Sequence, residues 1–208
     1  MAFDKGSRCW HSFGLLPSAA TIGPSGFTFT GSKRMASALN AFMKIGKAEG
    51  EARQGIYGKE KWIELQNWEW SVEAETSWTK GGGAAVGKPS PEKMSWEHYW
   101  DKSSHLILGY ICTGTSFPSI DLHMCKGVGT AEPQVYFKIH MEEAFITKVT
   151  QKAGDDGAVV QTVEMVFKTI HIDYAKQGSD KNNPGKLDAF VSYDWDIPAG
   201  KASPATGA

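Results

Sequence analysis

A glycine-rich stretch at residues 82–89 has the residue types that could hold a nucleotide phosphate. It reads G-G-A-A-V-G-K-P and fits the pattern G-x-x-x-x-G-K up to its last position. That position requires a serine or threonine whose hydroxyl binds magnesium, and Pro89 has no hydroxyl. Such a loop must also open a helix, which Pro91 and the alternating residues after it prevent. We therefore interpret the stretch as a flexible interface loop, and we expect no cofactor.

Histidine and cysteine side chains could supply zinc ligands. His123 and Cys125 are two residues apart, and Cys112 and His171 could complete a set. One H-x-C pair without a second closely spaced pair is a weak zinc pattern, and this one falls on a predicted strand beside a turn. Core or rim positions are favoured, so no metal site is predicted. With Cys9, the cysteines are expected to be reduced thiols, and the spacing leaves a disulfide between Cys112 and Cys125 open.

Two arrangements have the residue types of acid–base catalysis. Glu142 and Glu143 are adjacent along a predicted strand, so they point to opposite faces and cannot share a site. His98 and Asp101 could form a general base with its orienting carboxylate. No nucleophile lies at a spacing that supports this role, because the serines at 103–104 are better placed to cap a helix. No catalytic residue is predicted, and the chain is expected not to be an enzyme.

The aromatic content indicates a second class of function. The chain has 8 tryptophans and 6 tyrosines, and a carbohydrate-binding module of the sandwich type uses exposed rings that stack on sugars. The alternation of residues instead assigns Trp68, Trp70, Tyr193 and Trp195 to the core. A carbohydrate-binding sandwich remains the alternative to the function inferred below.

Composition excludes several partners. The net charge is −1, and the 22 basic residues are scattered singly, without the stripe that a nucleic-acid groove requires. No apolar run approaches the roughly 18 residues of a membrane span. Neither nucleic acid nor membrane insertion is therefore expected. At 208 residues, a single main domain is the default.

Residues 1–38 differ from the rest of the chain. They are rich in Gly, Ser, Thr, Ala and Pro and have no period of 2 or 3.6, so a flexible N-terminal extension is predicted. In the alternative interpretation, translation begins at Met35. The apolar stretch at 13–16 is too short for a signal peptide. The domain is assigned to 39–201, and residues 202–208 to a flexible tail.

From residue 39 onward, alternation with period two predicts strands. The first is Asn40–Ile45, followed by a charged loop at 46–60. A long strand is predicted over Trp62–Glu75, and its apolar phase changes partway, which requires a bulge near Gln66–Asn67. Bulges bend strands and allow barrels to close.

A single helix is predicted after a strand at 93–99. Ser103 or Ser104 caps it, it runs to about Thr113, and Gly114 ends it. Further strands are predicted at about 119–125, 134–149, 159–174 and 188–197. One helix among roughly seven strands indicates a mainly β fold, a small closed or two-sheet β-barrel with one short flanking α-helix.

An ordered set of segments then resembles a known family. In order, the chain contains A-F-M-K-I-G, W-I-E-L…W-x-W, G-G-G…G-K, S-W-E-H-Y-W-D-K-S-S before the helix, L-x-x-C-K-G-x-G before Q-V-Y-F-K-I, then I-H-I-D-Y and Tyr193-Asp194-Trp195. From Leu39 to about Lys201 this order resembles the hemolysin-coregulated protein (Hcp) family, the tube subunit of bacterial type VI secretion. Pro89, Pro91 and His105 depart from the family pattern, and residues 1–38 have no counterpart.

The resemblance implies a structural role. Hexameric rings would stack head to tail into a hollow tube that carries effector proteins and works with sheath and spike proteins. The protein would assemble in the bacterial cytoplasm and be secreted without a cleaved signal peptide. Exposed edge strands near 39–45 and 188–197 would be covered by neighbouring subunits.

Glu69 and the loop Ser77–Pro91 are each assigned a role in the tube. Glu69 lies between two core tryptophans and must point to the opposite side, which the resemblance assigns to the lumen. Pairing of Glu69 with a lysine or arginine at a subunit contact is the alternative. The loop Ser77–Pro91 is expected to project and to make ring-to-ring contacts. Its contact residues would be Gly81, Gly82, Gly83 and Val86.

Overall fold

The computed structural model describes residues 40–78, 84–126, 134–154, 157–177 and 186–203. The predictions for the extension at 1–38, the start at Met35, Cys9 and Gly81–Gly83 lie outside these residues. Ala202, which was assigned to a flexible tail, lies in a strand. In chain order the elements are β1 (Ala41–Ile45), α1 (Gly55–Lys59), β2 (Ile63–Glu69), β3 (Val72–Trp78), β4 (Ala84–Pro91), β5 (Met94–Tyr99), α2 (Lys102–Thr113), β6 (Phe117–Lys126), β7 (Gln134–Ala153), β8 (Val159–Val166), β9 (Thr169–Tyr174), β10 (Val191–Asp196) and β11 (Lys201–Ala202).

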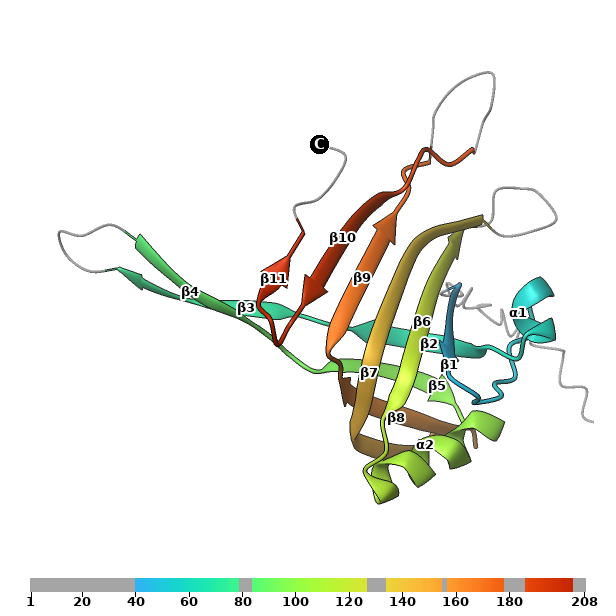
Figure 1. The fold of residues 1–208 in the computed structure, drawn as a ribbon. Helices are drawn as coiled ribbons and strands as arrows, with labels where there is room; N and C mark the ends of the chain where they lie inside the picture. Colours follow the sequence, from blue (N-terminus) through green and yellow to red (C-terminus); the bar gives the residue numbers. More distant parts are fainter. Residues whose placement is uncertain (1–39, 79–83, 127–133, 155–156, 178–185, 204–208) are drawn as a thin grey trace, which may run out of the picture. The chain divides into compact units, whose positions relative to one another are not determined.

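Most strands belong to one sheet that closes on itself. Nine strands are hydrogen-bonded in the order β11-β10-β9-β7-β6-β1-β2-β5-β8, and β7 also pairs with β8 (Figure 1). The six strands from β7 to β8 in this order therefore form a closed barrel, from which β9, β10 and β11 extend. The predicted class, a mainly β barrel with a short flanking helix, is confirmed.

Strand β7 belongs both to the barrel and to its extension. Its residues Phe137–Glu142 pair with β9, and its residues Phe145–Ala153 pair with β8. Glu143, between the two halves, has a left-handed φ of 49°. The prediction of one strand over 159–174 is wrong. Strand β8, which pairs with the second half of β7, ends at Val166, and strand β9, which pairs with the first half, begins at Thr169.

The tryptophan-rich segment was predicted in part. The bulge is confirmed, since the register between β2 and β5 shifts between Leu65 and Asn67. The strand does not continue to Glu75 without a break, because it is interrupted after Glu69 and resumes as β3. The predicted loop Ser77–Pro91 is also wrong: β3 and β4 form a separate two-stranded antiparallel ribbon (Figure 1). Residues 84–88 therefore lie in a strand, which a phosphate-binding loop could not do.

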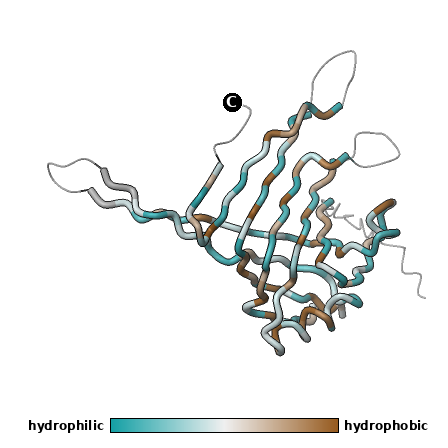
Figure 2. The backbone as a smooth tube through the Cα atoms, viewed as in Figure 1, coloured by the Kyte–Doolittle hydropathy of each residue, from teal (hydrophilic) through white to brown (hydrophobic). Residues whose placement is uncertain are grey.

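Hydrophobic and hydrophilic residues alternate along the strands of the sheet, as Figure 2 shows. The apolar members of this alternation fill the barrel. Trp195 is buried in this core, while Trp68, Trp70 and Tyr193 are half-buried and pack against it. The largest fully buried side chains of the barrel core are Trp96, Phe117, Met43, Ile45, Ile63, Leu65, Met94, Ile107, Ile120, Leu122 and Ile139.

Helix α2 packs against the barrel through Ile107, which is buried, and Tyr110, whose ring stacks on Phe117 at 4.0 Å. Gly114 ends the helix in the left-handed conformation, as predicted. The N-cap is Asp101 and not Ser103 or Ser104. An aspartate accepts hydrogen bonds from first-turn N–H groups as well as a serine does. In the part of the chain that the structure describes, no helix is long and apolar enough to cross a membrane.

The segment 46–60 is not only a loop, because it contains α1. Tyr57 of α1 packs on the outer side of the barrel wall, where its ring stacks on Phe42 at 4.1 Å. Strand β1, which carries Phe42, was predicted to be an edge strand. That prediction is wrong, since β1 lies between β2 and β6. At the other end the sheet terminates in β11, which pairs with β10 only at Trp195 and Asp196.

Candidate functional site

The residues that most resemble a catalytic group lie at the start of α2. His98 Nε2 is 3.3 Å from Ser104 Oγ and 3.9 Å from Asp101 Oδ1, which accepts a hydrogen bond from Ser103 N. The side chains of His98, Ser103 and Ser104 have no exposed surface. Burial lowers the pKa of His98 and favours its neutral form. Because no substrate can reach these groups, they position the helix start.

The four residues considered for zinc lie in three separate places: His123 with Cys125, Cys112 on α2, and His171 on β9 beside Asp194. Tyr57 Oη is 3.1 Å from Cys125 Sγ and 3.3 Å from His123 Nδ1, beneath α1. Burial raises the pKa values of Tyr57 and Cys125 and lowers that of His123. Cys112 is exposed on α2, and Cys112 and Cys125 are both free thiols. Among the described residues, no three His, Cys, Asp or Glu side chains are grouped to hold a metal.

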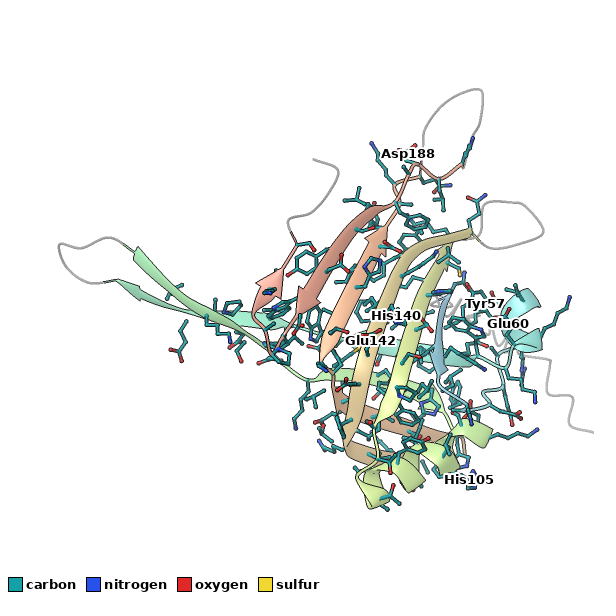
Figure 3. All side chains as sticks on the ribbon, viewed as in Figure 1. Tyr57, Glu60, His105, His140, Glu142 and Asp188 are labelled. Carbon is teal, nitrogen blue, oxygen red and sulfur yellow. The ribbon has the colours of Figure 1, made fainter. Side chains whose placement is uncertain are left out.

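The two glutamates of β7 are engaged separately. Glu142 accepts a hydrogen bond from Thr169 Oγ1 at 3.2 Å, and Glu143 accepts one from Lys168 Nζ at 2.7 Å. Figure 3 shows Glu142 beside His140 on the same strand. The two carboxylates do not form a catalytic pair.

A row of charged side chains crosses the outer face of the sheet. Its members are in register on five neighbouring strands, and each carboxylate–histidine pair is hydrogen-bonded. His140 Nδ1 donates to Asp121 at 2.6 Å, and His171 Nδ1 donates to Asp194 at 2.5 Å. We call this row the outer ladder; it consists of Lys44, Asp121, His140, His171 and Asp194.

A surface hollow of about 390 Å³ lies beside the outer ladder. Its polar lining combines the two histidines of the ladder with Thr169, Lys201 and carboxylates from β7 and β10, and its apolar lining is Ile170 and Trp195. The carboxylates are Glu142, Asp194 and Asp196. The hollow is therefore polar, with three carboxylates and one lysine in its lining.

Glu69 lies on the outside of a different part of the barrel. It is exposed at the end of β2, opposite Ser95 of β5, and both flanking tryptophans pack toward the core. Within the described ranges, Glu69 has no ion-pair partner. Nearby, Glu97 of β5 accepts hydrogen bonds from Asn67 at 2.7 Å and from Thr162 at 3.1 Å. This outer face is polar.

An apolar groove of about 290 Å³ separates the root of the β3–β4 ribbon from β10 and β11. Val72 and Pro89 of the ribbon face Tyr193 and Ala202 across it. Val72 is exposed. The groove is a surface on which apolar groups could be covered by another chain.

Comparison with known proteins identifies the family. Residues 42–174 match the family model described as "Type VI secretion system effector, Hcp". This chain belongs to the Hcp family. It is 27% identical over 161 residues to "Protein hcp1" of Pseudomonas aeruginosa, a match that covers 77% of this chain and 96% of that protein.

Solved Hcp structures have the same fold. Hcp1 from Salmonella typhimurium is 26% identical to this Hcp chain, with a TM-score of 0.63 over 80% of this chain and 99% of the other. A structure described as a type six secretion system protein superposes with a TM-score of 0.69 at 20% identity, covering 80% and 100% of the two chains. At that identity the likeness establishes the fold alone.

The outer ladder is the candidate site that the sequence did not predict. In K-I-H-M-E (138–142), the polar residues alternate with Ile139 and Met141, and I-H-I-D (170–173) repeats the pattern. This alternation could have placed His140 and His171 on the outer face of this Hcp chain. Their alignment depends on strand register, which the alternation does not contain.

Proposed function

We propose that this Hcp chain is a structural tube protein of a type VI secretion system and not an enzyme. Hexameric rings would stack into a hollow tube that carries effector proteins, with sheath and spike proteins as further partners. The observation that carries this proposal is the match to the Hcp family over residues 42–174. The β3–β4 ribbon, whose strands pair only with each other among the described residues, also supports it. Assembly would take place in the bacterial cytoplasm before secretion.

The β3–β4 ribbon supports self-association. Residues 72–76 and 87–90 of the ribbon are exposed, and its two strands pair only with each other among the described residues. An isolated two-stranded ribbon is marginally stable in water, so contact with a neighbouring subunit would stabilise it. When a head-to-tail contact repeats from subunit to subunit, it forms either a closed ring or an open stack.

Light scattering after size exclusion tests the ring. The full-length chain should elute as a species of six 22.7 kDa chains. A stable monomer that binds a glycan column would support the carbohydrate-binding alternative instead. The structure offers that alternative no specific support, because Trp68 stacks on Phe137 at 5.9 Å and Trp70 lies 5.7 Å from Phe167.

Ring-to-ring contact is assigned to Gly81, Gly82, Gly83 and Val86. Deleting residues 81–86 removes the first three residues of β4 and none of the barrel strands. Hexamers should persist while long tubes and secretion are lost. Dissociation of the rings themselves would place these residues within the ring interface and contradict the assignment.

Glu69 is assigned to the lumen. A ring of such carboxylates around a water-filled bore would be screened beyond about 8–10 Å, so it would cost little stability. It would retain cargo proteins that have a basic patch. Glu69→Arg should therefore form rings that lose basic cargo, whereas Glu51→Arg, an equal charge change at an exposed position outside β2 and the ribbon, should retain it. Failure of Glu69→Arg to form rings would instead indicate a subunit contact.

A further inference from the structure

On β6, β7, β9 and β10 the outer face of the sheet is polar over three successive cross-strand rows, whereas on β1 one of these rows reaches Phe42, which Tyr57 of α1 covers. The central row is the outer ladder. One flanking row includes Lys138 and Asp173, and the other includes Glu142 and Asp196. Side chains of the central row are substantially exposed, with 41% for His140 and 58% for Asp194. This face is therefore available to a partner.

Acidic groups outnumber basic groups on this face. Five carboxylates lie in the three rows, and the lysines there are three. Two of these lysines are already engaged: Lys44 Nζ donates to the carbonyls of Glu60 and Lys61, and Lys138 Nζ lies over the ring of Phe190. The third, Lys201, lines the hollow itself. Lys168, paired with Glu143, also interacts with Glu142 and Asp196. The carboxylates are Asp121, Glu142, Asp173, Asp194 and Asp196.

The two histidines of the outer ladder do not converge on a shared ligand. His140 Nε2 points toward Glu142 Oε1 at 3.8 Å, and His171 Nε2 lies 3.1 Å from Asp173 Oδ1. The nitrogens are thus directed to carboxylates on opposite sides of the row. This arrangement disfavours a metal held between the rings and places each imidazole beside two carboxylates.

We propose that this face, centred on the hollow beside the outer ladder, binds an arginine- or lysine-rich segment of a partner protein and releases it on acidification. The hollow presents Glu142, Asp194 and Asp196 with an apolar floor of Ile170 and Trp195. Carboxylates of this kind accept charge-assisted hydrogen bonds from a guanidinium group. The floor accommodates the methylene stem of the same side chain.

Release follows from the charge on His171. When its imidazole is neutral, the face has a net negative charge that attracts a basic segment. Protonation of His171 places a positive charge beside Asp194 and Asp173 and reduces that excess. The carboxylates of Asp194 and Asp173 raise the pKa of His171, the larger effect being the hydrogen bond to Asp194. Release should therefore begin above the usual histidine pKa of about 6.5.

The proposal does not rest on ring assembly, because every residue involved belongs to one chain. It also concerns strands other than the one that carries Glu69. A binding face could therefore exist if the tube proposal failed, and the tube could form without it.

Fluorescence anisotropy of a labelled peptide of alternating arginine and glycine tests the proposal with the full-length chain. The peptide should bind at about pH 8.5 and lose about tenfold in affinity at about pH 5.5, where carboxylates remain ionised and histidines do not remain neutral. The variant His171→Gln should bind with the same affinity at both pH values. No binding at about pH 8.5, or an acid loss that persists in this variant, would overturn the proposal.

A matched pair of charge variants locates the site. Asp194→Asn/Glu142→Gln should weaken binding about fivefold, since exposed charge pairs contribute a few tenths to 1 kcal/mol each. Glu97→Gln/Glu164→Gln removes the same charge from the outer face of β5 and β8 and should change affinity less than twofold. Equal losses in both pairs would mean attraction to the overall charge and would contradict a site at the hollow. Light scattering of each sample reports ring assembly separately.

Discussion

His98 and Gln161 lie directly opposite each other on β5 and β8, and both side chains are fully buried. His98 Nδ1 and both amide atoms of Gln161 have no hydrogen-bond partner among the described residues. A buried polar group without a partner costs about 1–3 kcal/mol. This pair is therefore a point at which the barrel is less stable than its apolar core would allow.

Replacing Gln161 by leucine should stabilise the protein. Gln161→Leu keeps a similar volume and removes the unsatisfied amide, so we expect a gain of about 1 kcal/mol, or about 2–4 °C in melting temperature. Gln151→Leu on exposed β7 is the control and should change stability by less than about 0.5 kcal/mol. A lower melting temperature for Gln161→Leu would mean that the amide is satisfied in solution.

Two histidines should give opposite pH dependences of stability. Burial lowers the pKa of His98, so the unfolded chain binds its proton more readily and stability falls as the pH drops below about 6.5. The pKa of His171 is raised by Asp194, so its contribution is present below about 6.5 and is lost as the pH rises through the folded-state value.

Urea unfolding from about pH 8 to about pH 5 measures both effects. His98→Gln should reduce the acid loss of stability, and His171→Gln should increase it. One proton accounts for at most about 1.4 kcal/mol per pH unit, and the partly exposed His171 should account for much less. Parallel curves for the wild type and His98→Gln would show that His98 does not titrate in this way.

Local patterns predicted much of the fold. The change of apolar phase between Leu65 and Trp68 located the bulge, and Gly114 located the end of α2. Helix α1 was missed because its stability comes from distant contacts, chiefly those of Tyr57 with Phe42 and Cys125. The break between β8 and β9 has no glycine or proline signal and is set by the exchange of partners along β7.

For the candidate sites, too, local patterns predicted one part and not the other. Exposure of Glu69 followed from the alternation around it. The alignment of His140 with His171 requires the register between β7 and β9, and their sequence separation contains no trace of it. Sequence alone therefore could not predict which residues of different strands lie side by side.

The N-cap of α2 should contribute measurably to stability. Asp101 accepts a hydrogen bond from Ser103 N at 2.9 Å, and its backbone N–H donates to Ser104 Oγ at 3.2 Å. Asp101→Ala should cost about 1 kcal/mol, or about 2–4 °C in a thermal melt, and Asp101→Asn only a few tenths. Thr113→Ala at the exposed end of the helix is the control. An equal loss in Asp101→Asn would point to charge and not to capping.

The same substitution at two glycines should have opposite effects. At Gly50, a Cβ atom would lie 2.3 Å from the carbonyl oxygen of Trp62 and 2.5 Å from the nitrogen of Ile63. These are backbone atoms held by the hydrogen bonds from Gly50 N to Lys61 O and from Ala52 N to Trp62 O, both 2.9 Å. Neither of the two segments can move away without breaking these hydrogen bonds, so Gly50→Ala should destabilise the protein by about 1–3 kcal/mol.

Gly109 provides the matched case within α2. A Cβ atom there would meet nothing within 4 Å, and alanine in a helix interior is about 0.5–1 kcal/mol better than glycine. Gly109→Ala should therefore raise the melting temperature by about 1–4 °C, while Gly50→Ala lowers it by at least that much. If Gly50→Ala melted like the wild type, the segment before α1 would not lie against β2 in solution, and the packing of Tyr57 that depends on it would also be wrong.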